Sequence, residues 1–410
     1  MVNAEYWIWL QTVFGAGSTK PIHTLEYFDT VKDFYNAGVD GWKRCRHLTS
    51  ADIEKLKSVS LKSSQRVIDH CDKKGYQILT PEDELYPVNL IRIKNPPCVL
   101  YVKGDMPDFN DEAAIAVVGT RKCTNEGIAL AGTLGYRLSQ SGMIVVSGGA
   151  LGCDIAASRG AVLAKAKSVI VMGCGLSVPY LMKNERIRRD VAENGAIISE
   201  LHPLEPASKT TFPIRNRLMS ALALGTLVIQ APKRSGALLT VDHALEQGKD
   251  IFAIPGGITA KEYSGNNKLL EDGVFPVYTP ADIVSEYICE YPHKLNLDNA
   301  YTPLAEDEMF KSILEKLENK SQNDNKKPVT KEQKEEAKEH KEEPEKTAVD
   351  TSHLTGRNAK IYNLFTSEPV NLDTIINASN EDPADVMIAV TELEMDGLLK
   401  SIPGGRYERV

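Results

Sequence analysis

A series of short apolar segments, each followed by a stretch of helix-forming residues, constrains the fold more than any other feature of this sequence. The segments lie at 115–118, 143–146, 168–172, 196–199, 226–230, 250–254 and 274–278. Such an alternation is typical of βαβ units, which bury a parallel sheet between two layers of helices. Two further strands are expected before them, at 76–80 and 98–103. The sequence therefore predicts an α/β fold with an extended Rossmann-like parallel sheet over residues 74–295.

The residues before the sheet, 1–73, predict a small helical domain. One helix opens at Tyr6 and stops at Phe14–Gly17, and a second apolar pattern with three- and four-residue spacing continues to about Gly38. Two helices joined by a glycine-containing turn are compatible with a SAM or helix-hairpin-helix fold, although an ordinary helical hairpin gives the same pattern. Because Lys20 is the only cation close to that turn, we have little reason to expect DNA binding by this domain.

The residues after the sheet predict a linker and a second domain. Residues 296–352 form the predicted linker, because Glu315–Lys346 is rich in Lys and Glu and has almost no apolar side chains to bury. Within residues 353–410, three apolar helix faces and a β-hairpin about Pro403–Gly405 predict a winged helix. Its third helix, Ala384–Asp396, has no Lys or Arg and carries Asp385, Glu392, Glu394 and Asp396. An acidic helix repels a duplex backbone, so we expect this domain to contact protein, with binding to duplex DNA as the alternative.

Composition limits the classes of protein to which the chain can belong. Hydrophobic residues make up 42% and charged residues 25%, as in a globular protein with a sizeable core. The net charge of −8 argues against nucleic acid, but an acidic body can carry a local basic strip. The seven cysteines are scattered without a CxxC pair, which favours a reducing cytoplasm and argues against a zinc site or a disulfide framework. Neither a membrane span nor a secretion signal is expected.

A glycine-rich stretch, Ser147–Asp154, lies between an apolar strand and a helix-forming segment. A strand, a glycine-rich turn and a helix together direct free backbone N–H groups toward an anion. Glycine suits such a turn because it tolerates positive φ and lets a phosphate approach the backbone. We therefore predict a phosphate-binding turn, although a tight βα turn without a ligand has the same pattern. Asp154 is expected to cap the helix.

Cations and one aromatic residue follow other strands of the predicted sheet. Since parallel sheets bind ligands at the carboxyl ends of their strands, these residues are expected at one edge. Cations on a nucleic-acid backbone together with an aromatic platform hold single strands without sequence preference. The competing interpretation is that Arg215 and Arg217 form salt bridges to Glu200 or Glu205 and do not bind DNA. The predicted DNA-binding residues are Arg121, Lys122, Ser147, Gly148, Gly149, Gly152, Lys209, Phe212, Arg215, Asn216 and Arg217.

Several motifs along the predicted sheet domain resemble the DNA-processing protein A family (DprA, also called Smf). The motifs are Tyr86-Pro87 with Pro96-Pro97, Val118-Gly119-Thr120-Arg121, Ser147-Gly148-Gly149-Ala150 with Gly152 and Asp154, Phe212-Pro213 with Arg215-Asn216-Arg217, Ser235–Thr240, Pro255-Gly256 and Gly265-Asn266-Asn267. The order of domains is also similar to that of longer members of the family. The sequence departs from the usual pattern at Cys153, Ser158, Leu181 and Gln230.

The resemblance implies a homodimeric protein that binds single-stranded DNA, protects incoming DNA and loads the RecA recombinase onto it in natural transformation. It implies neither catalysis nor a cofactor, and a cytoplasmic location. The family's DNA-binding positions fall on Arg121, Lys209, Phe212 and Arg215–Arg217 of this sequence.

Two enzyme classes are alternatives. A nucleotide phosphoribohydrolase on a similar sheet is suggested by Pro255-Gly256-Gly257, but Ile258-Thr259-Ala260 breaks the expected motif, and Tyr263 stands where a glutamate is expected. A dinucleotide-dependent dehydrogenase would need three spaced glycines at a helix start, and Gly173-Cys174-Gly175 supplies two.

Overall fold

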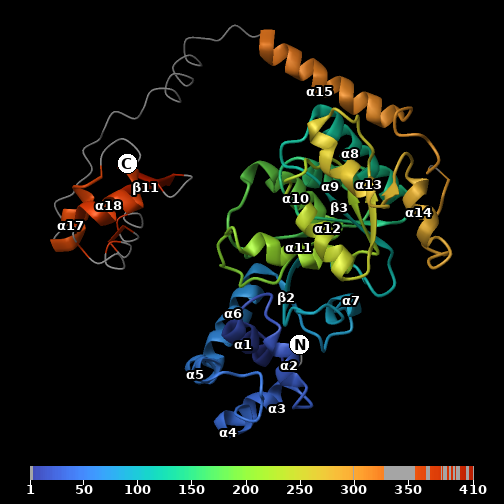
Figure 1. Ribbon diagram of the computed structural model, residues 1–410. Coiled ribbons are helices and arrows are strands. Elements are labelled where there is room, and N and C mark those ends of the chain that lie inside the picture. Colours follow the sequence, from blue (N-terminus) through green and yellow to red (C-terminus); the bar gives the residue numbers. More distant parts are fainter. Residues whose placement is uncertain are drawn as a thin grey trace. The chain divides into compact units, whose positions relative to one another are not determined.

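The computed structural model consists of two compact units, Met1–Asn325 and Lys326–Val410 (Figure 1). The structure describes residues 3–298 and 300–326 of the first unit and its boundary. In the second unit it describes 356–365, 370–379, 381, 386, 389, 390, 393, 398–402 and 406–409. None of the helices among these residues combines the length and apolar character needed to cross a membrane. All seven cysteines lie within the described residues and are free.

A nine-stranded sheet forms the centre of the first unit, in the order β1-β2-β6-β5-β4-β3-β7-β8-β9. Strands β3 to β9 pair in parallel, whereas β2 pairs antiparallel with both β1 and β6. The predicted Rossmann-like fold is therefore confirmed. The strands are Gln77–Leu79, Leu100–Gly104, Ala114–Val118, Ile144–Ser147, Ser168–Val171, Ala196–Ser199, Gly225–Val228, Asp250–Ala253 and Phe275–Pro276 for β1 to β9.

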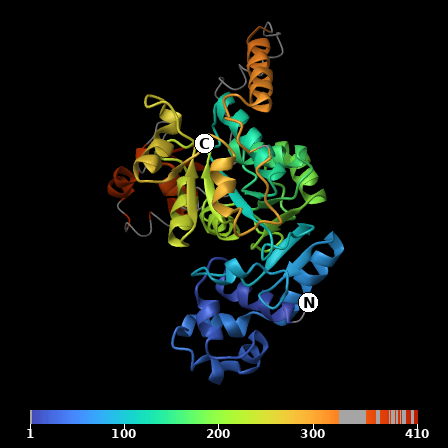
Figure 2. The same ribbon diagram turned by 90° about the vertical axis from the view of Figure 1, so that its right-hand side faces the viewer.

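Helices cover both faces of this sheet (Figures 1 and 2). On one face the apolar cluster joins the sheet to α8 (Asn125–Gln140), α9 (Cys153–Leu163) and α14 (Ala281–Tyr287). On the other it joins the sheet to α7 (Val88–Ile91), α11 (Thr211–Leu222) and α12 (Leu238–Glu246). The other helices that follow the strands are α10 (Glu185–Glu193), α13 (Ser264–Glu271), η1 (Met182–Asn184) and η2 (Lys261–Tyr263).

The central strand β3 shows why these segments are continuously apolar. Ile115 and Val117 point into the cluster with α8 and α9, while Ala114 and Val118 point into the cluster with α11 and α12. All are buried. Full burial of one such valine or isoleucine stabilises the fold by roughly 1.5–3 kcal/mol. A strand covered on both sides therefore cannot alternate between apolar and polar residues.

The sheet reverses its direction of growth beside β3. Strand β3 has β4 on one side and β7 on the other, and the chain builds outward from β3 to β6 before it returns to β7. The connections after β3 and β7 therefore leave in opposite directions and leave a crevice at the carboxyl ends of these strands. In open α/β sheets this crevice is the usual ligand site.

The N-terminal helices lie in the same unit as the sheet, next to β1 and β2 (Figure 2). The prediction of one second helix that continues to about Gly38 is wrong, because the chain forms two helices there, α2 and α3. Thr30 caps α3 by accepting a 3.1 Å hydrogen bond from the N–H of Asp33. The helices α1 to α6 are Ala4–Phe14, Lys20–Leu25, Val31–Asn36, Gly38–Trp42, Ser50–Ser58 and Leu61–Lys74.

The segment predicted as the start of the linker is packed instead. Ala300 and Leu304 are buried, and Asp307 accepts a 2.8 Å hydrogen bond from Arg137 of α8. The chain then continues as α15, Glu308–Lys326. A few apolar anchors among polar residues are enough to hold this segment, which composition alone did not reveal. The rest of the predicted linker, residues 327–352, lies outside the described residues.

The C-terminal unit contains α17 (Gly356–Tyr362), α18 (Leu372–Ser379) and a small sheet of order β10-β12-β11. Its strands are Val370–Asn371, Leu399–Ile402 and Arg406–Arg409 for β10, β11 and β12. The predicted third helix contributes Val386, Ala389, Val390 and Leu393 to the apolar cluster of this unit. These elements agree with the predicted winged helix. The acidic residues Asp385, Glu392, Glu394 and Asp396 and the turn Pro403–Gly405 lie outside the described residues.

Acid should weaken the N-terminal helices through Asp52. Burial would raise the pKa of Asp52, but hydrogen bonds from Lys20 and Thr49 and the charge of Lys20 outweigh it and lower the pKa to about 2. The stabilisation of the folded N-terminal helices by ionised Asp52 is thus complete above about pH 3.9, the pKa of an aspartate in the unfolded chain. It is lost as the pH falls toward 2, the pKa of Asp52 in the folded protein. We expect Asp52→Asn to lower the free energy of unfolding by about 1 kcal/mol at pH 7, because it removes a negative charge from the first turn of α5, and by less at pH 3, in urea titrations. The exposed pair Glu54–Lys57 provides the control: Glu54→Gln should have little effect, and an equal effect of both variants would contradict the role of Asp52.

Candidate nucleic-acid interface

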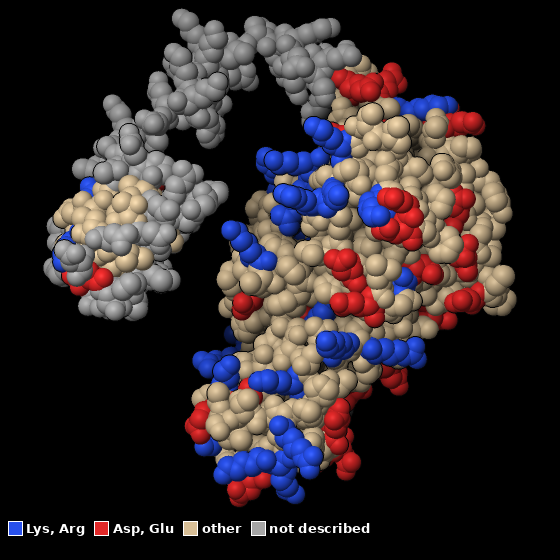
Figure 3. Space-filling model, viewed as in Figure 1, with Lys and Arg blue, Asp and Glu red and all other residues tan. Residues whose placement is uncertain are grey.

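A cleft of about 530 Å³ opens at the carboxyl ends of β3 and β7. Its walls are the turn after β3, the start of α9, the first turns of α11, the loop that begins at Pro232 after β7 and the first turn of α12. Figure 3 shows that positive side chains gather on one side of the sheet-bearing unit, while acidic ones are more frequent on the other. Because its lining residues follow β3 and β7, the cleft lies at the edge of the sheet that the sequence predicts. Four of the lining residues are cations: Arg121, Lys209, Arg215 and Arg234.

Phe212 is the aromatic centre of this cleft. Its half-buried ring lies 5.1 Å from the guanidinium carbon of Arg121 and 6.0 Å from that of Arg215. The ring of Tyr180 lies at 5.6 Å from it. Beneath the ring, Gly173 leaves the necessary space, because a Cβ there would lie 2.6 Å from Cδ1 of Phe212. The position of the Phe212 ring is therefore set by contacts with Arg121, Arg215, Tyr180 and Gly173.

Arg215 forms part of the cleft wall rather than its surface. It is 6% exposed, donates a hydrogen bond to the carbonyl oxygen of Val171 and donates a second one, of 3.1 Å, to the Asn216 side chain. Burial lowers the pKa of Arg215, and the charge of Asp154 opposes that shift. Burial likewise raises the pKa of Asp154, against the charge of Arg215. The two groups thus partly compensate each other's charge inside the wall.

The glycine-rich turn uses its backbone donors internally. The N–H of Gly148 donates to Oδ2 of Asp154 at 3.1 Å, and the N–H of Gly149 donates to Oγ of Ser147 at 3.3 Å. Ser147 is buried, and its hydroxyl also bonds to that of Ser158 at 2.7 Å. A phosphate would have to displace the side chains of Asp154 and Ser147 from these N–H groups. The structure therefore gives no support for the predicted contact of DNA with Ser147, Gly148 or Gly149.

The glycines of this turn serve close packing. A Cβ on Gly148 would lie 2.3 Å from Nη1 of Arg215 and 2.6 Å from Oδ2 of Asp154, and one on Gly152 would lie 2.4 Å from the carbonyl oxygen of Thr120. Gly152 also has a φ of 86° and occupies the N-cap of α9. The prediction that Asp154 caps this helix is therefore wrong, since its carboxylate binds back to the turn.

Arg217 forms a salt bridge to Glu200. For this arginine the structure therefore supports the alternative to DNA binding that the sequence left open. Arg217 is 2% exposed, and its Nη2 donates to both carboxylate oxygens of Glu200, at 2.7 and 2.6 Å. The same carboxylate accepts a 2.9 Å hydrogen bond from the N–H of Gly17. Arg217 thus joins α11 to the N-terminal helices and does not line the cleft, which corrects its assignment to the DNA site.

The remaining predicted residues are exposed or half-buried. Lys209 is exposed and lines the cleft together with the half-buried Asn216. Lys122 is exposed but is not part of the cleft lining. Sequence reasoning missed Arg234 and Tyr180 as site residues, although Arg234 follows β7 at the same edge. Pro213 is the third residue of α11, so Arg215 lies in the second turn of this helix.

The fold and the cleft define a doubly wound α/β protein with cations and an aromatic residue at its topological switch point. The model of the DNA recombination-mediator protein A family matches residues 77–288, more than half of the chain. A second model, of the DprA winged helix domain, matches residues 344–405. The chain therefore belongs to the DprA family, as the sequence motifs indicated.

Individual relatives agree with this assignment. Protein Smf of Synechocystis is 27% identical over the full length of both chains. DNA processing protein DprA of Streptococcus pneumoniae is 35% identical, covering 50% of this chain and 72% of that one, and that of Bacillus subtilis is 31% identical, covering 58% and 83%. The X-ray structure of Streptococcus pneumoniae DprA superposes with a TM-score of 0.61 at 28% identity, covering 69% of this chain and 97% of that chain.

Gly148→Ala should destabilise the fold, because its Cβ would displace the Arg215–Asp154 pair. Overpacking of this kind costs about 1–3 kcal/mol, measured as a lower urea midpoint. Gly236→Ala is the matched control, since a Cβ there meets nothing within 4 Å, and its effect should stay within about 0.5 kcal/mol. Equal midpoints for both variants would show that Gly148 is not required for packing.

Arg217→Met should leave Glu200 buried without its ionic partner. Breaking a buried pair in this way costs about 3–5 kcal/mol, which chemical denaturation would detect. Lys57→Met breaks an exposed pair with Glu54 and should cost much less. A loss no larger than that of Lys57→Met would contradict the structural role of Arg217.

Proposed function

We propose that the cleft binds single-stranded DNA, with a base stacked on Phe212 and phosphates held by Arg121 and Lys209. The observation that carries this proposal is the 5.1 Å approach of exposed Arg121 to the half-buried Phe212 ring. Cations beside an aromatic platform hold a strand through its backbone and stack its bases without reading sequence. Arg234 extends the row of cations along the same cleft.

The buried Arg215 would act indirectly on this strand. It lies beside the Phe212 ring and behind the cleft surface, where it adds positive potential and fixes the ring. Asp154 reduces that potential, but its carboxylate is turned toward the N–H of Gly148. In this arrangement the carboxylate is engaged in the wall and is not offered to a substrate as a base.

We further propose that the protein works in DNA processing as a cytoplasmic, non-catalytic homodimer that passes the strand to RecA. Membership of the DprA family supports this role, and the free cysteines are compatible with a reducing compartment. The family's winged helix domain matches residues 344–405. This domain would then serve as a second contact module.

Fluorescence anisotropy with a labelled poly-deoxythymidine oligonucleotide tests the DNA site. Phe212→Ala should weaken binding by about 1–3 kcal/mol, because it removes one stacking platform. Arg121→Ala and Lys209→Ala should each weaken binding and reduce the slope of log affinity against log salt by about 0.7. Lys57→Ala, an exposed cation of the N-terminal helices, should leave both quantities unchanged.

The outcomes separate the proposal from its alternatives. Unchanged affinity and salt slope in the three cleft variants would overturn the DNA site. Release of free base from nucleoside monophosphates would support the phosphoribohydrolase alternative instead. That alternative has no geometric support at the Pro255–Gly257 loop, where Gly256 packs against the ring of buried Tyr263.

A further inference from the structure

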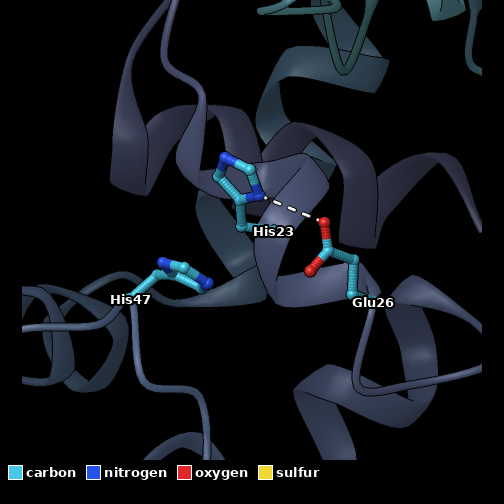
Figure 4. Close-up of side chains that lie close together, drawn as sticks. All are labelled: His23, Glu26 and His47. Atoms are coloured by element: carbon cyan, nitrogen blue, oxygen red, sulfur yellow. Dashed lines mark hydrogen bonds and ion pairs between the residues drawn. The ribbon is translucent and has the colours of Figure 1, made fainter.

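Three metal-binding side chains converge among the N-terminal helices, outside the cleft (Figure 4). His23 lies in the last turn of α2, Glu26 follows this helix, and His47 lies between α4 and α5. Nδ1 of His23 lies 3.1 Å from Oε1 of Glu26. The rings of His23 and His47 are stacked with centroids 4.8 Å apart. One ligand atom from each residue lies within 4.8 Å of the other two.

We propose that His23, Glu26 and His47 form a binding site for one Zn²⁺ ion, with water in the fourth position. Two imidazoles and one carboxylate are a frequent zinc ligand set where a coordination position stays open. Zinc bonds of about 2.0–2.2 Å place tetrahedral ligand atoms about 3.4 Å apart. The His23–Glu26 pair already has nearly this separation, so His47 alone has to move closer.

The surroundings permit that movement. Glu26 and His47 are exposed and His23 is half-buried, so His47 is free to turn from its stacked position until a ring nitrogen, and not the ring face, points toward His23 and Glu26. The ion would connect the end of α2 with the segment before α5, and would close the chain around α3 and α4. Lys20 and Asp52 already join α2 to α5 at 2.7 Å. Zinc would therefore add a second link between the same two parts of the domain.

The chain contains a matched control for this site. His243 and Glu246 have the same spacing of three residues on α12, and Nδ1 of His243 lies 3.8 Å from Oε2 of Glu246. They belong to no group of three metal-binding residues among those that the structure describes. If a helical His–Glu pair were enough to bind zinc, both places would bind it equally.

Isothermal titration of the full chain with ZnCl₂, after removal of metal with a chelator, tests the proposal. The titrations use a Cys289→Ser background, because Cys289 is an exposed thiol. We expect one equivalent of Zn²⁺ to bind and MgCl₂ to give no saturable binding. His47→Ala and Glu26→Gln should each weaken zinc binding by more than roughly 10-fold, because loss of a direct ligand costs no less than loss of a second-shell partner, while His243→Ala should retain the parent affinity.

Circular dichroism of each variant would show that it is folded before titration. Absence of saturable zinc binding in the parent would overturn the proposal, as would equal affinities of the parent, His47→Ala and Glu26→Gln. Oligonucleotide binding by the cleft is measured separately and does not enter this result.

Discussion

The buried ion pair between Arg217 and Glu200 is the constraint on which the candidate interface depends. Two charges removed from water are stable only when they are well paired, and here Glu200 also accepts the N–H of Gly17. The pair therefore fixes α11 against the end of β6 and against the N-terminal helices at once. Because Phe212, Arg215 and Asn216 belong to the same helix, the position of the cleft residues follows from that anchor.

Helical geometry explains how one short motif performs two tasks. Phe212, Arg215, Asn216 and Met219 have the spacing of a single helix face, and all four line the cleft. Arg217 is rotated by about 200° from Arg215, which takes it away from that face. Two arginines that lie two residues apart thus have different places: Arg215 is in the wall of the cleft and Arg217 is in the core beside Glu200, so the charge of one cannot substitute for the other.

The sequence was sufficient for the elements that depend on local pattern. Each predicted strand of the sheet was found. For β3 to β7 the reason is that apolar runs covered on both faces leave a strong signal, and the edge carrying Arg121, Lys209 and Phe212 followed from the strand ends. Pattern could not show that Asp154 and Ser147 use the amides of the glycine-rich turn, or that Arg217 is buried against Glu200. Those outcomes depend on partners distant in sequence. The break at Thr30 and the packing of Leu304 likewise depend on a few atoms of tertiary contact.

The glycine beneath Phe212 also limits how this protein can diverge. Any side chain at position 173 would meet the ring, so a substitution there and a change of the ring would have to occur together. Exposed Lys209 has no such coupling and can be exchanged singly. Over evolutionary time, the aromatic platform is therefore expected to persist as a unit with its glycine, while an exposed cation such as Lys209 changes position more freely.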